Sequence, residues 1–205
     1  MPKIVLGVLA STKGTDLQAL IDEIEAGQLD AEIACVISNK GNCFALERAK
    51  KHGIEAIFLN PKDFGAREEF DEKLVQLLEA RKVELVLLIG YNKFLGKPFL
   101  DAFKNRAMNI HPSLLPAFKG WYRDVYKQVL DSGAKISGCS LFFVTPEPDS
   151  GPIIAQRSCK ILEGESLESL KEKVQAAEKE TLLRGIRLFQ AGKLKIEGNK
   201  VRVLD

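Results

Sequence analysis

The sequence predicts an α/β protein with a Rossmann-like, mostly parallel sheet flanked by helices. Short apolar runs, among them Ile4–Leu9 and Glu84–Ile89, alternate with amphipathic segments of helical length. The second run is apolar after its first residue, which is typical of a parallel strand buried on both faces. The last residues alternate in polarity around Gly198-Asn199, and this pattern predicts a C-terminal β-hairpin.

The predicted elements follow one another with short loops between them. The strands are expected at 4–9, 32–37, 56–59, 84–89, 107–110, 136–144 and 153–161, before a hairpin at 194–203. The helices are expected at 16–26, 66–81, 125–130 and 166–190, with one more ending near residue 52. Ser166, with Glu168 and Ser169 in the first turn, is a typical helix start. Because no linker-like segment is visible, we expect one domain over residues 1–205, with halves of about 1–100 and 101–205.

The composition limits the kinds of partner. The chain has 205 residues, 45% of them hydrophobic, and its 30 basic and 28 acidic residues give a net charge of +2. This near-balance favours small-molecule substrates over nucleic acid or a membrane surface. The start shows no signal-peptide pattern, so we expect a cytoplasmic protein, monomer or homodimer. The four cysteines have no metal-like spacing, which predicts buried thiols and no metal site; they are Cys35, Cys43, Cys139 and Cys159.

Asn109 and His111 stand at the end of a predicted buried strand. Two prolines follow in the segment Asn109–Pro116, so the polar side chains lie at the carboxyl end of a parallel strand, where open α/β sheets bind ligands. Because the two residues are two apart, their side chains leave an extended backbone on the same face. An amide beside an imidazole can stabilise an oxyanion and move a proton. The same pattern also fits a structural histidine at a strand end.

Asp149 lies in the turn Pro148–Pro152, between two apolar strands. Asp, Ser, Gly and Pro are all favoured in turns for backbone reasons, so a turn former explains the residue. If Asp149 met His111, its carboxylate would orient the ring and stabilise the imidazolium form. Periodicity does not show whether the two residues meet.

Several segments resemble the glycinamide ribonucleotide formyltransferases, a branch of the folate-dependent formyltransferase superfamily. The most specific match is N-I-H-P-S-L-L-P at 109–116, followed by Asp149 and G-P-I-I at 151–154. Shorter matches are L-Q-A-L at 17–20, I-S-N-K at 37–40 and A-L-E-R-A at 45–49. The resemblance covers nearly the whole chain and implies the formyltransferase fold, with the phosphate site in the N-terminal half and the catalytic and folate-binding site in the C-terminal half.

The resemblance also implies a reaction. The formyl group of 10-formyltetrahydrofolate, a co-substrate, would pass to the amine of glycinamide ribonucleotide in purine biosynthesis, through a tetrahedral intermediate. Asn109 and His111 would stabilise the oxyanion, while Asp149 supports His111 and helps proton transfer. Pro112 and Glu178 would lie at the substrate amine and ribose, since Glu178 matches an acidic residue of the family on the late helix.

The predicted phosphate loop departs from the family pattern. Relatives carry S-G-N-G-S-N after the first strand, where backbone amides at a helix N-terminus bind phosphate. Here the segment is Ser11–Asp16, and the resemblance assigns the phosphate to Lys13, Gly14, Thr15 and Asp16. Asp16 places a carboxylate where the family has a neutral amide. An ordinary helix cap by Thr15 or Asp16 is the alternative interpretation.

The predicted folate loop departs as well. The family has G-[FY]-M-R-[IL]-L-S-P, and this chain has G-Y-N-K-F-L-G-K-P at 90–98. The residues that the resemblance assigns to the folate are Asn92, Lys93, Phe94, Leu95 and Arg67. Replacing arginine by Lys93 removes a planar fork suited to a carboxylate. After Gly120 the family has histidines, and this chain has residues 121–123 instead, without a histidine.

Three functions stay open at this point. The first is transfer to glycinamide ribonucleotide, and the second is transfer to another amine, such as a sugar nucleotide or a different phosphorylated amine. The third is folate binding without catalysis, which the intact set of Asn109, His111 and Asp149 argues against. Hydrolysis of formyltetrahydrofolate is a further alternative, although proteins of that kind usually carry an added N-terminal domain.

Overall fold

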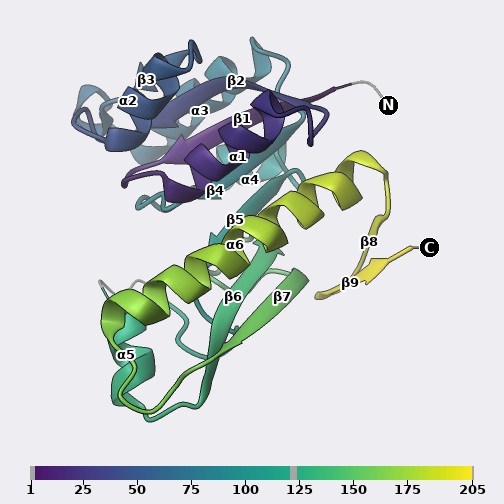
Figure 1. The fold of residues 1–205 in the computed structure, drawn as a ribbon. Coiled ribbons are helices and arrows are strands. Elements are labelled where there is room, and N and C mark those ends of the chain that lie inside the picture. The colour runs from purple at the N-terminus through teal and green to yellow at the C-terminus, as the bar shows by residue number, and fades with distance from the viewer. Residues whose placement is uncertain (1–2, 121–123, 205) are drawn as a thin grey trace. The chain divides into compact units, whose positions relative to one another are not determined.

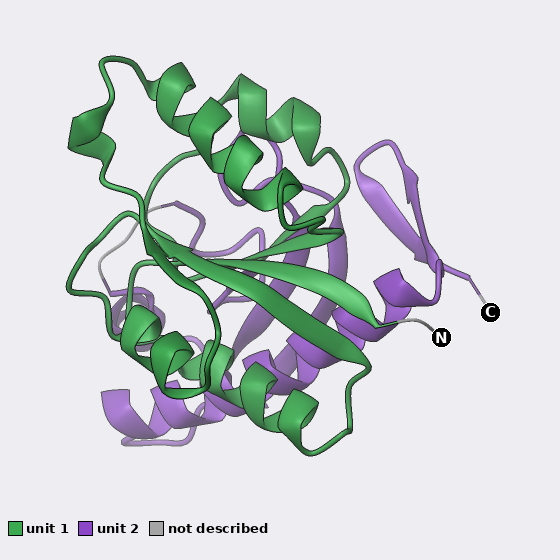
Figure 2. Cartoon of the chain, turned by 90° about the horizontal axis from the view of Figure 1, so that it is seen from above, with its two compact units in different colours: residues 1–109 green, residues 110–205 purple. Residues whose placement is uncertain are grey.

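The computed structural model describes residues 3–120 and 124–204. The chain divides into two compact units, residues 1–109 and 110–205 (Figure 2). Strand β5 (Ala107–His111) runs across this boundary, so that Asn109 ends the first unit and His111 lies in the second. The altered segment after Gly120, residues 121–123, lies outside the described part of the chain.

The first unit alternates strands and helices, as predicted. Its elements are β1 (Ile4–Ala10), α1 (Thr15–Glu25), β2 (Ala31–Ser38), α2 (Phe44–Lys51), β3 (Ala56–Phe58), the 3-10 turn η1 (Pro61–Asp63), α3 (Arg67–Glu79), β4 (Leu85–Ile89) and α4 (Lys97–Ala102). The strand order is β3-β2-β1-β4-β5, and each neighbouring pair is parallel. Helices of this unit lie on both faces of its sheet (Figure 2).

The core of the first unit explains this architecture. Every residue of β4 is buried, and Leu6, Val8 and Leu9 of β1 are inaccessible to solvent. Helix α1 buries one stripe at helical spacing, Leu17, Leu20 and Ile21. With both faces of the sheet covered, the loops at the carboxyl ends of the strands are the part of the sheet left to bind a ligand.

The second unit combines antiparallel and parallel pairs. Its elements after β5 are α5 (Val125–Asp131), β6 (Ile136–Phe143), β7 (Ile153–Lys160), α6 (Leu167–Gln190), β8 (Leu194–Glu197) and β9 (Lys200–Val203). Strands β6 and β7 are antiparallel, β9 joins β7 in parallel at Ile153↔Lys200, and β8 and β9 form the predicted hairpin. The long helix α6 runs beside β6 and β7 (Figure 1).

The N-terminus of α6 is capped as predicted. Ser166 precedes the helix with an extended backbone, and its hydroxyl accepts a hydrogen bond from the Ser169 backbone N–H at 3.2 Å. The helix buries a stripe that includes Leu170, Val174 and Ile186. This stripe packs the helix on its own sheet, and the helix also buries Glu178, which the family resemblance assigned to the substrate.

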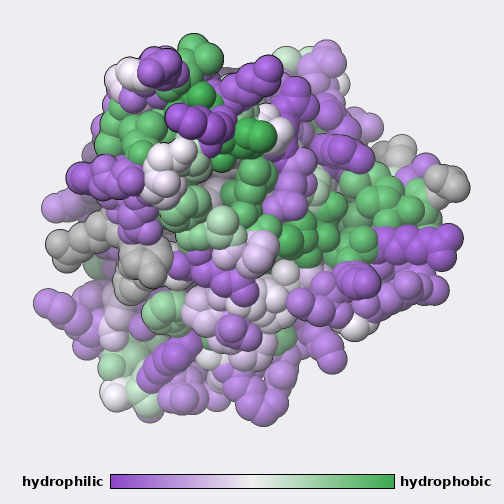
Figure 3. Space-filling view, turned by 90° about the horizontal axis from the view of Figure 1, so that it is seen from below, coloured by the Kyte–Doolittle hydropathy of each residue, from purple (hydrophilic) through white to green (hydrophobic). Residues whose placement is uncertain are grey.

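The surface is rich in charged side chains. Figure 3 shows one face on which hydrophilic residues surround a smaller area of hydrophobic ones. Among the described residues, each helix is too short or too polar to cross a membrane.

Candidate active site

The structure brings His111 and Asp149 together. Nδ1 of His111 lies 3.6 Å from Oδ2 of Asp149, although one residue ends β5 and the other belongs to the turn between β6 and β7. His111 is 7% exposed, and the Asp149 side chain is 13% exposed. In such a partly dehydrated setting a carboxylate beside the imidazole ring fixes the orientation of the ring.

The other nitrogen of His111 is held by the backbone. Nε2 lies 3.0 Å from the carbonyl oxygen of Phe118, which can only accept, so Nε2 carries a hydrogen and donates. In the neutral ring Nδ1 would then present its lone pair to the Asp149 carboxylate. A proton on Nδ1 would turn this contact into an attraction, and a ring placed in this way can accept and return a proton during a reaction.

The turn that carries Asp149 is held against the loop before residue 121. Asp149 has a left-handed backbone, with φ of 49°, which aspartate tolerates better than most residues. Its Oδ2 accepts a hydrogen bond from the Gly120 backbone N–H at 3.0 Å, and the Lys119 ammonium donates to the Ser150 hydroxyl at 3.0 Å. Both segments belong to the second unit, so the position of the carboxylate is determined within one compact body.

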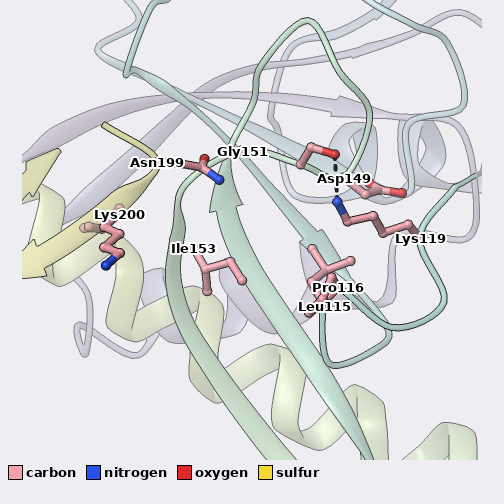
Figure 4. Close-up of a pocket in the computed structure, with 10 residues that line it drawn as sticks. Leu115, Pro116, Lys119, Asp149, Gly151, Ile153, Asn199 and Lys200 are labelled. Carbon is pink, nitrogen blue, oxygen red and sulfur yellow. Dashed lines mark hydrogen bonds between the residues drawn. The ribbon is translucent and has the colours of Figure 1, made fainter. Parts of the chain in front are cut away.

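A pocket of about 480 Å³ adjoins this turn. Figure 4 shows Leu115, Pro116 and Lys119 on one side and Ile153 and Asn199 on the other. The dashed line in the figure is the Lys119–Ser150 hydrogen bond. An apolar lining with a few polar groups is typical of small-molecule sites. This pocket therefore gives a ligand a place beside the Asp149 turn.

Asn109 lies two residues before His111 on β5. Its backbone pairs with Leu88 of β4, and its side chain is partly exposed, whereas Ile110 is buried. Because side chains alternate along a strand, those of Asn109 and His111 leave β5 on the same side. The strand itself thus sets an amide and an imidazole next to each other.

The predicted phosphate loop leads into an uncapped helix. Gly14 precedes α1 in the left-handed conformation, with φ of 66°, and no side chain caps the helix. The alternative of a cap by Thr15 or Asp16 is therefore wrong, because both residues already lie within the first turn of α1. The first N–H groups of the helix are left without a side-chain acceptor, which suits an anion.

The loop is tethered from its outer side. The guanidinium of Arg48 donates to the Lys13 carbonyl oxygen at 2.8 Å, and the Cys43 thiol donates to the Thr12 carbonyl oxygen at 3.1 Å. Both carbonyl groups thus have hydrogen-bond donors at α2. Burial raises the pKa of the Asp16 carboxyl to about 6. The acidic residue in the predicted anion site consequently changes its charge near neutral pH.

The predicted folate loop packs against α3. Asp71 is fully buried, and its Oδ2 accepts the Gly96 backbone N–H at 2.6 Å and lies 3.8 Å from Arg67 Nε. Burial raises the pKa of Asp71, and the Gly96 hydrogen bond opposes that rise. The Lys93 ammonium lies 4.6 Å from the centre of the Phe70 ring. Asp71 thus anchors the loop and lies beside Arg67, one of the two predicted folate-binding cations.

The remaining predicted folate-loop residues lie in different surroundings. Phe94 is 49% exposed and Leu95 is 8% exposed, so the loop presents one aromatic side chain to solvent. The side chain of Asn92 accepts a hydrogen bond from the Asn39 amide at 3.1 Å. Asn92 therefore contacts the residue that follows β2.

Two residues predicted at the acceptor lie in the second unit. Pro112 follows β5 directly and is partly exposed. Glu178 is 5% exposed, on the face of α6 that also buries Ala177 and Thr181. A carboxylate buried to this degree needs polar partners.

Sequence reasoning missed Asp71, Phe118 and Ser11. Asp71 had a usable signal, because it follows Arg67 by four residues on a helix and such pairs lie on one face. Ser11 follows a strand directly, as ligand-contacting residues often do. Phe118 contributes a backbone carbonyl group, for which the sequence carries no signal.

The described residues contain no group of three His, Cys, Asp or Glu side chains arranged to hold a metal ion. Cys35, Cys43 and Cys139 are buried, as predicted, whereas Cys159 is partly exposed, and each of the four keeps its sulfur outside any disulfide. His52, the other histidine, follows α2 and contacts Glu25 through Nδ1 at 2.7 Å. This contact, together with one to Gln18, gives His52 a structural role.

The chain belongs to the formyl transferase family, whose sequence pattern it matches over residues 3–186. The trifunctional purine biosynthetic protein adenosine-3 of Gallus gallus is 36% identical over 200 residues, which are 97% of this chain and 20% of that protein. The protein of the same name from Drosophila pseudoobscura pseudoobscura is 41% identical over 196 residues, 95% of this chain and 14% of that protein. This chain therefore spans a fifth or less of these relatives' length.

Solved structures match the chain over nearly its whole length. Glycinamide ribonucleotide transformylase 1 from Symbiobacterium toebii has a TM-score of 0.94 and 43% identity, covering 99% of this chain and 95% of that one. A formyltetrahydrofolate deformylase from Pseudomonas syringae pv. tomato str. DC3000 has a TM-score of 0.88 and 28% identity, covering 99% of this chain and 66% of that one. The predicted formyltransferase fold is confirmed.

Proposed function

We propose that the protein transfers the formyl group of 10-formyltetrahydrofolate to the amine of glycinamide ribonucleotide, in the cytoplasm and as a step of purine biosynthesis. The observation that carries this proposal is the His111–Asp149 pair, 3.6 Å apart and largely buried, in a chain of the formyl transferase family. The names of the similar solved structure and of the curated relatives support the acceptor and the pathway.

The proposed reaction begins with attack of the acceptor amine on the formyl carbon. A carbon–nitrogen bond to the acceptor forms, and a tetrahedral intermediate with a negatively charged oxygen results. Asn109 stabilises this oxyanion by hydrogen bonding, and His111 does so when its Nε2–H turns from the Phe118 carbonyl oxygen to the oxyanion, a contribution of about 3 kcal/mol for each such donor. The bond from the formyl carbon to N10 of the folate then breaks, and the proton lost by the amine ends on N10.

Asp149 supports this chemistry through His111. Its carboxylate, which also accepts from the Gly120 N–H, faces Nδ1 of the ring, and in the absence of substrates the Phe118 carbonyl oxygen accepts from Nε2. A positioned acid–base group of this kind contributes a hundredfold or more to the rate. Arg67 and Lys93 supply positive charge at the folate loop, and the uncapped N-terminus of α1 supplies N–H groups for the acceptor phosphate.

Hydrolysis of formyltetrahydrofolate is the competing reaction, and the similarity to the deformylase favours testing it. Water would replace the amine as the nucleophile. The phosphate-binding features of α1 distinguish the two functions, because a hydrolase has no acceptor phosphate to bind. Release of formate without glycinamide ribonucleotide would identify the hydrolase.

The decisive experiment follows the full chain with 10-formyltetrahydrofolate and glycinamide ribonucleotide, measuring tetrahydrofolate and the formylated product. We expect turnover in the wild type and a fall in kcat of about 100- to 1,000-fold in His111→Ala and in Asn109→Ala. His52→Ala is the matched control, since the chain has two histidines and the second contacts Glu25 and Gln18.

The possible outcomes separate the alternatives. If kcat fell equally in His111→Ala and His52→Ala, the loss would be due to damage to the fold and not to the site. Turnover unchanged in both Asn109→Ala and His111→Ala would contradict the proposal. Formyl transfer to another phosphorylated amine, with none to glycinamide ribonucleotide, would keep the chemistry and replace the acceptor.

A further inference from the structure

Three hydrogen bonds form a closed ring between Ser11, Asn39 and Asn92, here called the polar ring. The Ser11 hydroxyl donates to Asn39 Oδ1 at 2.5 Å, and Asn39 Nδ2 donates to Asn92 Oδ1 at 3.1 Å. The Asn92 backbone N–H donates to the Ser11 hydroxyl at 3.0 Å and closes the ring. The three residues follow the carboxyl ends of β1, β2 and β4, which are neighbours in the sheet of the first unit.

The loops that contribute Ser11 and Asn92 also touch through their backbones. The Ser11 N–H donates to the Gly90 carbonyl oxygen at 3.2 Å. Gly90 has φ of 59°, and a Cβ atom there would lie 2.4 Å from Thr12 Oγ1. A side chain at position 90 would separate the two loops. The loop after β1 (residues 11–14) and the loop after β4 (residues 90–96) therefore form one continuous surface.

Each loop is fixed at its far side as well. Arg48 holds the Lys13 carbonyl group of the first loop, and the buried Asp71 holds the Gly96 N–H of the second. Between these anchors, the side chains of the polar ring connect the loop after β1 with the loop after β4. Ser11 is 5% exposed, so breaking one bond of the ring leaves a polar group with little access to water, which is unfavourable. Displacement of one loop is thus resisted by the other.

We propose that Asn92 is a positioning residue that couples the binding of the two substrates through the polar ring. This inference rests on the proposed function, which assigns the acceptor phosphate to the loop after β1 and the folate to the loop after β4. A ligand on either loop restrains the ring, and the second ligand then meets a loop that is already ordered. The coupling is reciprocal, because each ligand must change the affinity for the other by the same factor.

The test uses tetrahydrofolate and glycinamide ribonucleotide, which cannot react because neither carries a formyl group. Calorimetry gives the Kd of tetrahydrofolate with and without saturating glycinamide ribonucleotide. In the wild type we expect binding to tighten about fivefold or more when the second ligand is present. Asn92→Leu keeps the side-chain size but removes the acceptor of the Asn39 amide. In this variant we expect both ligands to bind, and we expect the Kd of tetrahydrofolate to be the same, within error, with and without glycinamide ribonucleotide.

Two further variants make the result specific. Ser11→Ala breaks the ring at another member and should lose the same coupling, and the double variant should lose no more than either single one. Asn42→Leu is the control, because Asn42 is exposed in the same unit, and it should keep the wild-type factor. Circular dichroism establishes that each variant is folded.

The outcomes distinguish this inference from the proposed function. Wild-type protein that binds neither ligand would contradict the proposed function itself. Wild-type protein that binds both ligands independently would overturn the coupling and leave the function standing. Coupling that persists in Asn92→Leu, or that falls further in the double variant, would overturn the role of the polar ring.

Discussion

The carboxyl group of Asp16 lies in the first turn of α1, where Gly14 leaves the helix uncapped. Burial raises its pKa from 3.8 to about 6. A raised carboxyl pKa means that the folded chain favours the protonated form more than the unfolded chain does. The folding penalty for the ionised form therefore accumulates between about pH 4 and pH 6 and is complete above that range.

Replacing Asp16 with asparagine removes this penalty. We expect Asp16→Asn to raise the free energy of unfolding by on the order of 1–2 kcal/mol at pH 8 and to leave it nearly unchanged at pH 4. Urea unfolding at the two pH values measures the difference. Asp22→Asn, on an exposed part of the same helix, should show no such pH dependence. An equal gain at both pH values would contradict the burial argument.

The same variant also reports on the phosphate assignment. If the acceptor phosphate binds at α1, loss of the negative charge at position 16 lowers the KM for glycinamide ribonucleotide at pH 8 and leaves the KM for the folate alone. A KM that stays constant would place the phosphate elsewhere.

Some contacts of single residues could be predicted from the sequence, and others could not. The pair Asn109 and His111 could be predicted from spacing, because a strand places alternate side chains on one face. The meeting of His111 with Asp149 could not, since it depends on how β6 and β7 carry a distant turn back to the end of β5. The hydrogen bond from His111 to Phe118 could not be predicted either, because every residue has a backbone carbonyl group and the sequence does not show which one accepts.

Helices α1 and α6 begin in opposite ways. Helix α6 supplies its own cap through Ser166, whereas α1 begins at a left-handed glycine without one. A helix that is capped by its own serine gains stability from it, and a helix left open keeps its N–H groups for a ligand. The N-terminus of α6 therefore serves the stability of the fold, whereas the N-terminus of α1 is a candidate binding site.

Loss of the α6 cap should cost stability. We expect Ser166→Ala to lower the free energy of unfolding by about 1 kcal/mol, since the Ser169 N–H loses its acceptor. Urea unfolding measures the change, and the exposed Ser158 supplies the control variant Ser158→Ala. If the free energy of unfolding fell no further in Ser166→Ala than in the control, water would replace the Ser166 hydroxyl as acceptor with no loss of stability.

The elements themselves were largely readable. The predicted strands and helices agree with the structure to within one or two residues at most ends, because buried runs and amphipathic stripes determine them. Helix α4 (Lys97–Ala102) and the turn η1 (Pro61–Asp63) were missed, because segments this short carry no periodic pattern. At the start of α1 the sequence left a helix cap by Thr15 or Asp16 as an alternative to a phosphate site, because the left-handed backbone of Gly14 that excludes the cap is not visible in the sequence.

At the scale of the whole chain, ligand binding should appear as thermal stabilisation. A ligand that binds the folded form at 100 times its Kd adds about 2.7 kcal/mol of stability. For a chain of this size we expect tetrahydrofolate to raise Tm by about 5–10 °C. Differential scanning fluorimetry measures the shift, and His111→Ala should retain it if the ring acts mainly on the transition state. The absence of a shift in the wild type would argue against a folate site.

The polar ring has a consequence for how this sequence can change over generations. An apolar replacement at Ser11 or Asn39 leaves both neighbours with unmet hydrogen-bonding groups, and one at Asn92 leaves the Asn39 amide without its acceptor. Such a replacement is tolerated best when the other two positions change with it. Among descendants of this chain the residues at these three positions should therefore change together, although they lie in the loops after three different strands.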